Sequence, residues 1–311
     1  MKNMVKIRKP FLYALALSLI GGSFFYWAYF TKAYFFKEVK MEIKGPNTIK
    51  ITMFSDLHAS EKKQAGGEMF LGDEYEKFLN EFLAHAKAFP SNLVVMNGDL
   101  IEGTRKPVDL GTSELRLVQK FLDEIPQEKA WVVGNHDLRS VNRSQWKAAL
   151  GIDYLDKSFE INDYKIIILD SNYGSEGKMN DSEGADTGVL LSDFQLAWLE
   201  NELKNSDKTK IVFMHHPPVT GDEIKPSYTP RDIEKIQNIF SECGVVAVFS
   251  GHTERLAHKK LDGVDYYVFP GPTKFDFYPG AFESIRMIDK KAIVTFFSKN
   301  EKGEYVRQKV E

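Results

Sequence analysis

Residues 49–58 read IKITMFSDLH, a run of β-branched and apolar residues that ends in an aspartate and a histidine two positions apart. The run is typical of a buried β-strand. The arrangement returns as LVVMNGD (93–99), AWVVGNHD (130–137), KIVFMH (210–215) and VVAVFSGH (245–252). Each of these strand-like runs therefore delivers, at its end, a polar side chain that is able to bind a metal ion.

Amphipathic stretches separate the strand-like runs. Residues 75–89 place their apolar side chains on one helical face. Ser192 with Gln195 fits a capping box that opens a second helix, and Thr229-Pro230 fits the start of a third, which Gly244 would end. Further strands are expected at 165–169, 266–269, 284–288 and 292–297, and a long loop at 172–188. This alternation predicts a layered α/β fold.

The polar residues at the strand ends are expected to lie together. Taken alone, an Asp, Asn or His after a strand is most often a turn former or a helix cap. Five strand ends in phase are different, because the carboxyl ends of strands in an open α/β sheet meet at one edge, where such folds place their sites. The histidine at position 85 falls within a helical pattern and is expected to be structural or exposed. The polar residues at these strand ends are Asp56, His58, Asn97, Asp99, Asn135, His136, Asp137, His215 and His252.

Composition excludes several other classes of protein. The formal net charge is −3 and the pI is about 6.2, and no cluster of Lys and Arg occurs after the N-terminus, so a nucleic-acid-binding surface is not expected. Cys243 is the single cysteine, which excludes an intrachain disulfide framework and a cysteine-based zinc site.

The N-terminus predicts a membrane anchor. A basic segment, residues 1–10, precedes an uncharged run at 11–30, which is long enough to span a bilayer as a helix. A cleaved signal peptide is the alternative, but bulky aromatic residues occupy positions 24–27, 29 and 30, where small residues would precede a cleavage site. We therefore expect a cytoplasmic segment (1–10), a retained single-pass anchor (11–30) in the lipid bilayer of the cell membrane, a linker (31–40) and an extracytoplasmic catalytic domain (41–311).

The chain resembles the calcineurin-like metallophosphoesterases in the order of five motifs: D-x-H (56–58), G-D (98–99), G-N-H-D (134–137), H (215) and G-H-x (251–253). LDSNYG (169–174), SDFQLAWLENEL (192–203) and FMHHPPV (213–219) are similar to the branch that contains bacterial class III cyclic-nucleotide phosphodiesterases. The resemblance covers residues 49–297. It implies a four-layer αββα sandwich, with two mixed sheets flanked by helices, behind the transmembrane helix.

The resemblance also implies two divalent metal ions and their ligands. Asp56 and His58 would hold one ion, Asp99 would bridge both, and the second would be held by Asn135, His215 and His252. Two ions about 3.5–4 Å apart acidify a shared water, which becomes a metal-bridging hydroxide nucleophile toward phosphorus. Mixed oxygen and imidazole ligands suit Mn, Fe, Zn, Co or Ni, with Mn favoured.

His136 is the predicted catalytic residue outside the metal ligands, and Asp137 is predicted to orient it or to raise its basicity. Predicted substrate contacts are Asn135, His136, Arg139 and Thr253. Asn142 and Arg143 are weaker candidates, for which solvated surface is the simpler interpretation.

One position departs from the family pattern. The usual G-H-x-H reads Gly251-His252-Thr253-Glu254, so that a glutamate replaces the second histidine. Three interpretations stay open: Glu254 binds the first metal, His258 does so instead, or that metal is weakly held. We favour Glu254, since a carboxylate is a competent ligand for harder ions. Glu102 stands where the resemblance to purple acid phosphatases would require a tyrosine, which disfavours that group.

The sequence thus predicts a membrane-anchored, binuclear metal-dependent hydrolase of phosphomonoesters or phosphodiesters, with a phosphoester substrate and no evident obligate protein partner. A catalytically weak phosphoester-binding sensor is the alternative from another class, motivated by Glu254. A pyrophosphatase or phospholipid-headgroup hydrolase would use the same metal ligands.

Overall fold

The computed structural model describes residues 47–60, 74–103, 107–173, 191–221, 224, 233–272 and 278–310. They belong to a compact unit that runs from Gly45 to Glu311. Within these residues no helix is both long and apolar enough to cross a bilayer. The predicted anchor (11–30), the linker (31–40), most of the predicted loop at 172–188 and the Thr229-Pro230 helix start lie outside the described residues.

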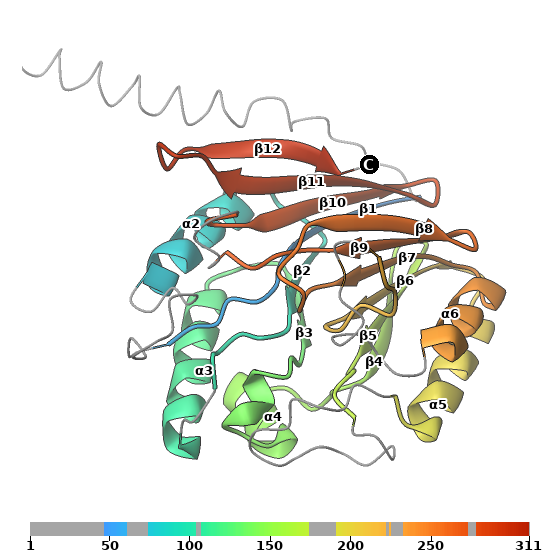
Figure 1. The fold of residues 1–311 in the computed structure, drawn as a ribbon, viewed down its shortest axis with the longest axis horizontal. Coiled ribbons are helices and arrows are strands. Elements are labelled where there is room, and N and C mark those ends of the chain that lie inside the picture. The colour runs from blue at the N-terminus through green and yellow to red at the C-terminus, as the bar shows by residue number, and fades with distance from the viewer. Residues whose placement is uncertain are drawn as a thin grey trace, which may run out of the picture. The chain divides into compact units, whose positions relative to one another are not determined.

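Two six-stranded mixed sheets form the centre of this unit (Figure 1). In each sheet the strands that carry site residues run parallel, and antiparallel strands extend the sheet toward its edges. The first sheet has the order β12 (Tyr305–Val310), β11 (Lys291–Lys299), β10 (Phe282–Ile288), β1 (Thr48–Phe54), β2 (Leu93–Asn97) and β3 (Glu128–Val132). The second has the order β4 (Lys157–Ile161), β5 (Tyr164–Leu169), β6 (Thr209–Met214), β7 (Val245–Ser250), β9 (Val264–Val268) and β8 (Ala257–Leu261).

Three apolar layers hold these elements together. Alternate residues of both sheets face each other in the central layer, with Ile51 and Val95 from the first sheet and Phe213 and Phe249 from the second. Helices cover the outer face of each sheet, so the expected αββα order is confirmed (Figure 1). The first sheet is covered by α2 (Tyr75–Ala88), α3 (Val108–Leu122) and α4 (Arg143–Leu150), and the second by α5 (Asp193–Lys204) and α6 (Ile233–Glu242).

The helix signals that fall on described residues are confirmed. Ser192 and Gln195 form the predicted capping box of α5. Gly244 adopts a left-handed conformation with φ of 72°, just beyond the end of α6. Asn142 forms a further capping box with Gln145 at the start of α4. The sequence had suggested Asn142 as a phosphate contact, whereas its side chain accepts the backbone N–H of Gln145.

Three strands and two helices were not predicted. The strands β4, β8 and β12 all lie at sheet edges, and most of their residues are partly or fully exposed. An edge strand needs no continuous apolar run, so it lacks the signal by which buried strands were recognised. Helices α3 and α4 also fall outside the predicted elements.

Candidate metal centre

The predicted ligands converge where the central strands end. Asp56 and His58 follow β1, Asp99 follows β2, and His215 follows β6. Ligand atoms of Asp56, Asp99 and His215 all lie within 4.8 Å of one another. A second group, of Asp56, His58 and Glu254, meets the same distance limit. The structure thus brings side chains from both sheets to one place.

The remaining ligands join this cluster through His252. The Nδ1 atom of His252 lies 3.0 Å from Oδ1 of Asn135, which comes from the loop after β3. The rings of His215 and His252 are 5.3 Å apart, in an edge-to-face arrangement. All six residues that the resemblance gives as metal ligands therefore lie in one cluster, together with Glu254.

The glycines that precede the ligands leave room for them. A Cβ on Gly98 would lie 2.3 Å from Nδ1 of His215, and one on Gly134 would lie 2.1 Å from Oδ1 of Asp99. A Cβ on Gly251 would lie 2.3 Å from Oδ2 of Asp56. Any side chain at these positions would displace a ligand, which explains why a glycine accompanies Asp99, Asn135 and His252.

The backbone is strained at the ligands. Among the described residues, nine non-glycine residues have positive φ. Five of them belong to the site, and the remaining four lie in the turns of three β-hairpins. A left-handed backbone conformation at a non-glycine residue costs about 1–3 kcal/mol of stability, and such residues cluster at functional sites. Its concentration here indicates that ligand position is maintained at the expense of stability. The five site residues concerned are Asp56, His58, Asp99, His252 and Glu254.

His215 is oriented as a metal ligand requires. Its ring is fully buried, and Nδ1 lies 2.9 Å from the backbone oxygen of Asn97, so Nδ1 carries the proton. The other nitrogen, Nε2, then presents a lone pair 3.1 Å from Oδ2 of Asp99, and it has no hydrogen-bond partner. Two lone pairs that face each other in a buried site require a cation or a proton between them, so these residues fit a divalent ion.

Glu102 orients His58 and was not predicted to take part in the site. Its carboxylate is 3% exposed, and Oε2 lies 3.1 Å from Nδ1 of His58. The opposite nitrogen, Nε2, faces the cluster, at 3.8 Å from Oδ2 of Asp99 and 3.3 Å from Oε1 of Glu254. A carboxylate behind a ligating histidine fixes the ring orientation and raises the basicity of the ligand.

The same carboxylate contacts His136. Oε2 of Glu102 and its backbone oxygen each lie 3.0 Å from Nδ1 of His136, while Nη1 of Arg139 lies 2.9 Å from that nitrogen. Nδ1 cannot donate to Glu102 and accept from Arg139 at the same time, and the two oxygens of Glu102 favour donation. Burial alone would raise the pKa of Glu102, but its hydrogen bonds with His136 and His58 outweigh burial and lower the pKa to about 2.

Asp137 has a different role from the one predicted. Its Oδ1 accepts the N–H groups of Leu100 and Ile101, at 2.8 and 3.1 Å, and its Oδ2 accepts that of Gly134 at 2.9 Å. The carboxylate that contacts His136 is that of Glu102, and Asp137 instead ties the loop after β2 to the loop after β3. Burial, followed by the charge of Asp99, raises the pKa of Asp137 to about 7.

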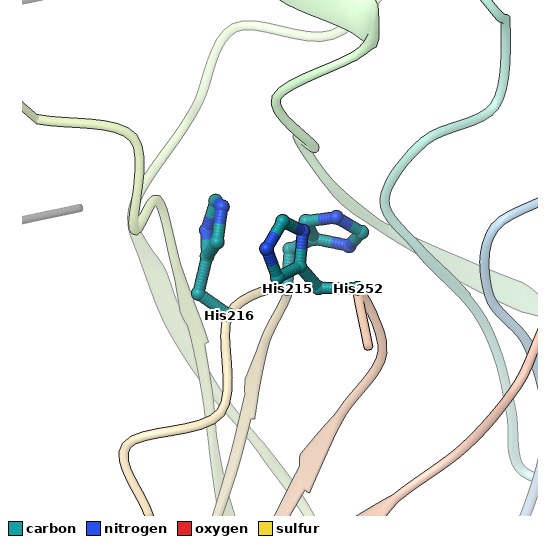
Figure 2. Close-up of side chains that lie close together, drawn as sticks. All are labelled: His215, His216 and His252. Carbon is teal, nitrogen blue, oxygen red and sulfur yellow. The ribbon is translucent and has the colours of Figure 1, made fainter. Parts of the chain in front are cut away.

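His216 completes a group of three histidines (Figure 2). The rings of His215, His216 and His252 stand beside one another at the ends of β6 and β7, and their ligand atoms lie within 4.8 Å of one another. Nδ1 of His216 lies 2.8 Å from Oγ of Ser171, which also accepts the backbone N–H of His216. This pair connects the loop after β5 to the site, and burial holds the pKa of His216 well below its usual range.

Two of the predicted substrate contacts stand beside this cluster. Arg139 lies against His136, and Thr253 is held between His252 and Glu254 in a tight turn, in which its N–H donates to the backbone oxygen of Gly251. Arg143, the weaker candidate, is 2% exposed and donates to Asp170 at 2.8 Å. Arg143 therefore has a structural role, so the two interpretations that the sequence allowed for it, a phosphate contact and a solvated surface residue, are both wrong.

The charges of the cluster are unbalanced without a cation. Burial, followed by the charge of Glu254, raises the pKa of Asp56 to about 7. Burial acts on Asp99 in the same direction, but neighbouring histidines, first among them His215, hold the pKa of Asp99 well below its usual range. Burial lowers the pKa of His215, but the charges of Asp99 and Asp56 outweigh it and raise the pKa to about 9.

Glu283 is a buried acid next to this cluster. It lies on β10 opposite Met53 and is fully buried, and neither carboxyl oxygen has a hydrogen-bond partner among the described residues. It shares its face of the strand with Ile285 and Met287, which pack in the central layer. Burial, followed by the charge of Asp56, raises the pKa of Glu283 well above 4.5, so the group is a neutral acid.

We predict that Glu283→Met stabilises the metal-free protein, by about 1–3 kcal/mol at pH 8, because it removes an unsatisfied buried acid. The effect should be smaller at pH 4.5. In the wild type the unfolded chain ionises as the pH rises above 4.5 while the folded chain keeps its proton, so its stability falls with rising pH. Urea unfolding at both pH values measures this, with Glu283→Gln as the variant that keeps the shape and cannot ionise. Equal stability of wild type and Glu283→Met at pH 8 would contradict the prediction.

Comparison with known proteins agrees with this geometry. The model of the calcineurin-like phosphoesterase family matches residues 49–255, which include every residue of the cluster. The chain belongs to the calcineurin-like phosphoesterase family. It is therefore a metal-dependent hydrolase of phosphoesters, and the resemblance seen in the sequence motifs is confirmed.

Relatives of this calcineurin-like phosphoesterase include cyclic-nucleotide phosphodiesterases. It is 25% identical to the 3',5'-cyclic adenosine monophosphate phosphodiesterase CpdA of Escherichia coli, over 71% of this chain and 74% of that protein. It is 27% identical to a probable cyclic nucleotide phosphodiesterase of Rhodococcus erythropolis, over 60% of each chain, which is less than two thirds of that relative's length. A dimetal phosphatase from Danio rerio shares the fold, with a TM-score of 0.65 and 16% identity over 85% of this chain and 99% of its own.

Proposed function

We propose that this phosphoesterase is a binuclear enzyme that cleaves phosphodiester bonds, with Mn favoured as the metal. The observation that carries the proposal is the position of Asp99. Its Oδ2 lies 3.1 Å from Nε2 of His215 and 3.8 Å from Nε2 of His58, so that one carboxylate oxygen faces a histidine from each predicted ion position. This is the arrangement that a bridging carboxylate requires. The names of the relatives favour diesters over monoesters.

The residues present would hold two divalent ions. In this proposal Asp56, His58 and Glu254 hold the first, Asp99 is shared, and the second is held by Asn135, His215 and His252. Bound divalent ions supply Lewis acidity to the phosphoryl oxygens and to an attacking water.

His136 would then move the proton that the leaving group needs. Donation of Nδ1–H to Glu102 orients the ring for delivery of a proton from Nε2 to the leaving oxygen. Arg139 stands beside His136 with donors suited to a phosphate oxygen. In this scheme Glu102 is a positioning residue, because it acts through His136 and His58.

We predict that the full-length protein hydrolyses bis(p-nitrophenyl) phosphate with added Mn, and that activity is lost on dialysis against a chelator and returns when Mn is restored. The monoester p-nitrophenyl phosphate should be a poorer substrate, and a panel that includes 3',5'-cyclic nucleotides would identify the leaving group. Tight binding of phosphoesters without turnover of any of them would support the sensor interpretation and would contradict the proposal.

In this proposal the enzyme is also anchored in the membrane by residues 11–30. The uncharged run at 11–30, with basic residues before it, supports a single-pass membrane protein whose catalytic domain lies outside the cytoplasm. A cysteine introduced at Asp193, an exposed position at the start of α5, should react with a membrane-impermeant reagent in intact cells. Reaction only after the cells are opened would contradict this topology.

A further inference from the structure

The two predicted ion positions have unlike ligands. The first is surrounded by carboxylates of Asp56, Asp99 and Glu254 and by one imidazole, that of His58. The second has two imidazoles, those of His215 and His252, with the amide oxygen of Asn135 and the shared Asp99. The difference depends on Glu254, because an imidazole there would give the two positions a similar set of ligands.

Glu254 is positioned to bind an ion. Its Oε2 accepts the N–H of Gly271 at 2.8 Å, which fixes one oxygen of the carboxylate. The other oxygen, Oε1, lies 3.3 Å from Nε2 of His58, on the side of that ring which faces Asp56. The arrangement therefore presents Oε1 to the space between His58 and Asp56.

Gly271 also connects Glu254 to the loop that carries Asp56. A Cβ on Gly271 would lie 2.2 Å from the backbone oxygen of Asp56, so the two segments are in direct contact. The backbone of Glu254 is itself held in a left-handed conformation, with φ of 55°. A constrained backbone together with an anchored carboxylate indicates that the position of Oε1 is maintained by its surroundings.

The alternative ligand, His258, is held elsewhere. It lies on β8, and its Nε2 is 3.0 Å from Oδ1 of Asp265 on the neighbouring strand β9. Its ring is stacked on that of Tyr267, with centroids 4.4 Å apart. None of the potential metal-binding groups found among the described residues includes His258. The structure therefore favours Glu254 over His258.

We propose that Glu254 shifts the preference of the first ion position from Zn²⁺ toward hard divalent cations of the Mn²⁺ class, so that the two positions differ in metal preference. The inference rests on the proposed binuclear function. Zn²⁺ binds most nitrogen and oxygen sites more tightly than Mn²⁺ does, and imidazole ligands favour Zn²⁺. Carboxylate oxygens suit Mn²⁺ and Mg²⁺. A third carboxylate in place of an imidazole therefore reduces the advantage of Zn²⁺ at this position.

The test uses the full-length protein, freed of metal and then dialysed against equal concentrations of Mn²⁺ and Zn²⁺. Bound metals are counted by elemental analysis, and bound Mn²⁺ is followed by its electron paramagnetic resonance signal. We expect two ions per wild-type chain, with a larger share of Mn²⁺ than in Glu254→His. Glu254→His should shift the Zn²⁺ to Mn²⁺ preference of the first position by about tenfold or more, toward two Zn²⁺ per chain. Glu254→Gln should bind one ion fewer.

His258→Asn is the matched control and should load metals as the wild type does, and circular dichroism establishes that each variant is folded. An unchanged metal ratio and number in both folded Glu254 variants would overturn the inference and would leave the binuclear function intact. Loss of an ion in His258→Asn alone would assign the ligand to His258. A wild-type chain that binds no divalent ion would overturn the proposed function itself.

Discussion

Replacement of Asp99 by asparagine is expected to lower phosphodiester turnover by about 10³-fold or more, because it removes the negative charge shared by both ion positions. In the wild type the backbone N–H of His136 donates to Oδ1 of Asp99 at 2.7 Å. Asparagine has nearly the same shape as aspartate, and its carbonyl oxygen can still accept this hydrogen bond. The loss should therefore come from metal binding and not from the fold. Bound metal should fall from two ions per chain to one or none, as measured by elemental analysis.

Two comparisons make the Asp99 result specific. Asp207→Asn removes a carboxylate from an exposed position between α5 and β6 and should change neither turnover nor metal content. High concentrations of Mn should restore only part of the activity of Asp99→Asn, since the amide oxygen is a weaker ligand than a carboxylate. Full activity with two tightly bound ions in Asp99→Asn would contradict the bridging role.

The convergence of the candidate metal ligands could be predicted because each one follows a strand that the sequence marks clearly. Apolar runs such as those of β1 and β2 are buried on both faces, and the polar residue after each run lies at the same edge of the sheet. Local pattern and topology therefore agree, and no knowledge of distant contacts was needed. The edge strand β12 shows the opposite case, because four of its six residues are exposed and its pattern carries little signal.

The supporting residues could not be predicted, because their roles come from contacts between distant segments. Glu102 acts on His58 and His136 only after the loops from β1, β2 and β3 have come together. Asp137 adjoins His136 in the sequence, yet the short helical turn at Asp137–Arg139 leaves its carboxylate with backbone N–H groups instead. Arg143 is buried because Asp170, which follows β5 of the other sheet, neutralises it and the backbone oxygen of Asn172 accepts a further hydrogen bond. For Asp137 and Arg143, adjacency to His136 in the sequence was the wrong guide.

His136→Ala provides the second large effect and separates proton transfer from metal binding. We expect kcat for a diester with a poor leaving group to fall by about 10²–10⁴-fold, which is the usual contribution of a general acid, while both metal ions stay bound. A nitrophenolate leaves without a proton, so the loss for bis(p-nitrophenyl) phosphate should be much smaller. Steady-state kinetics with a methyl and a nitrophenyl ester of the same phosphate measures this difference.

Glu102→Gln distinguishes an acid from a merely structural histidine. Because Glu102 accepts the Nδ1–H of His136 and so orients the ring, the amide should lower kcat for the methyl ester more than for the nitrophenyl ester. A residue that only packs would lower both rates alike. His258→Asn, which alters a histidine on β8 outside the cluster, should leave this leaving-group dependence unchanged. Equal losses for both esters in His136→Ala would assign His136 to phosphate binding, because a bound phosphoryl group is common to the two substrates whereas the need for a proton is not.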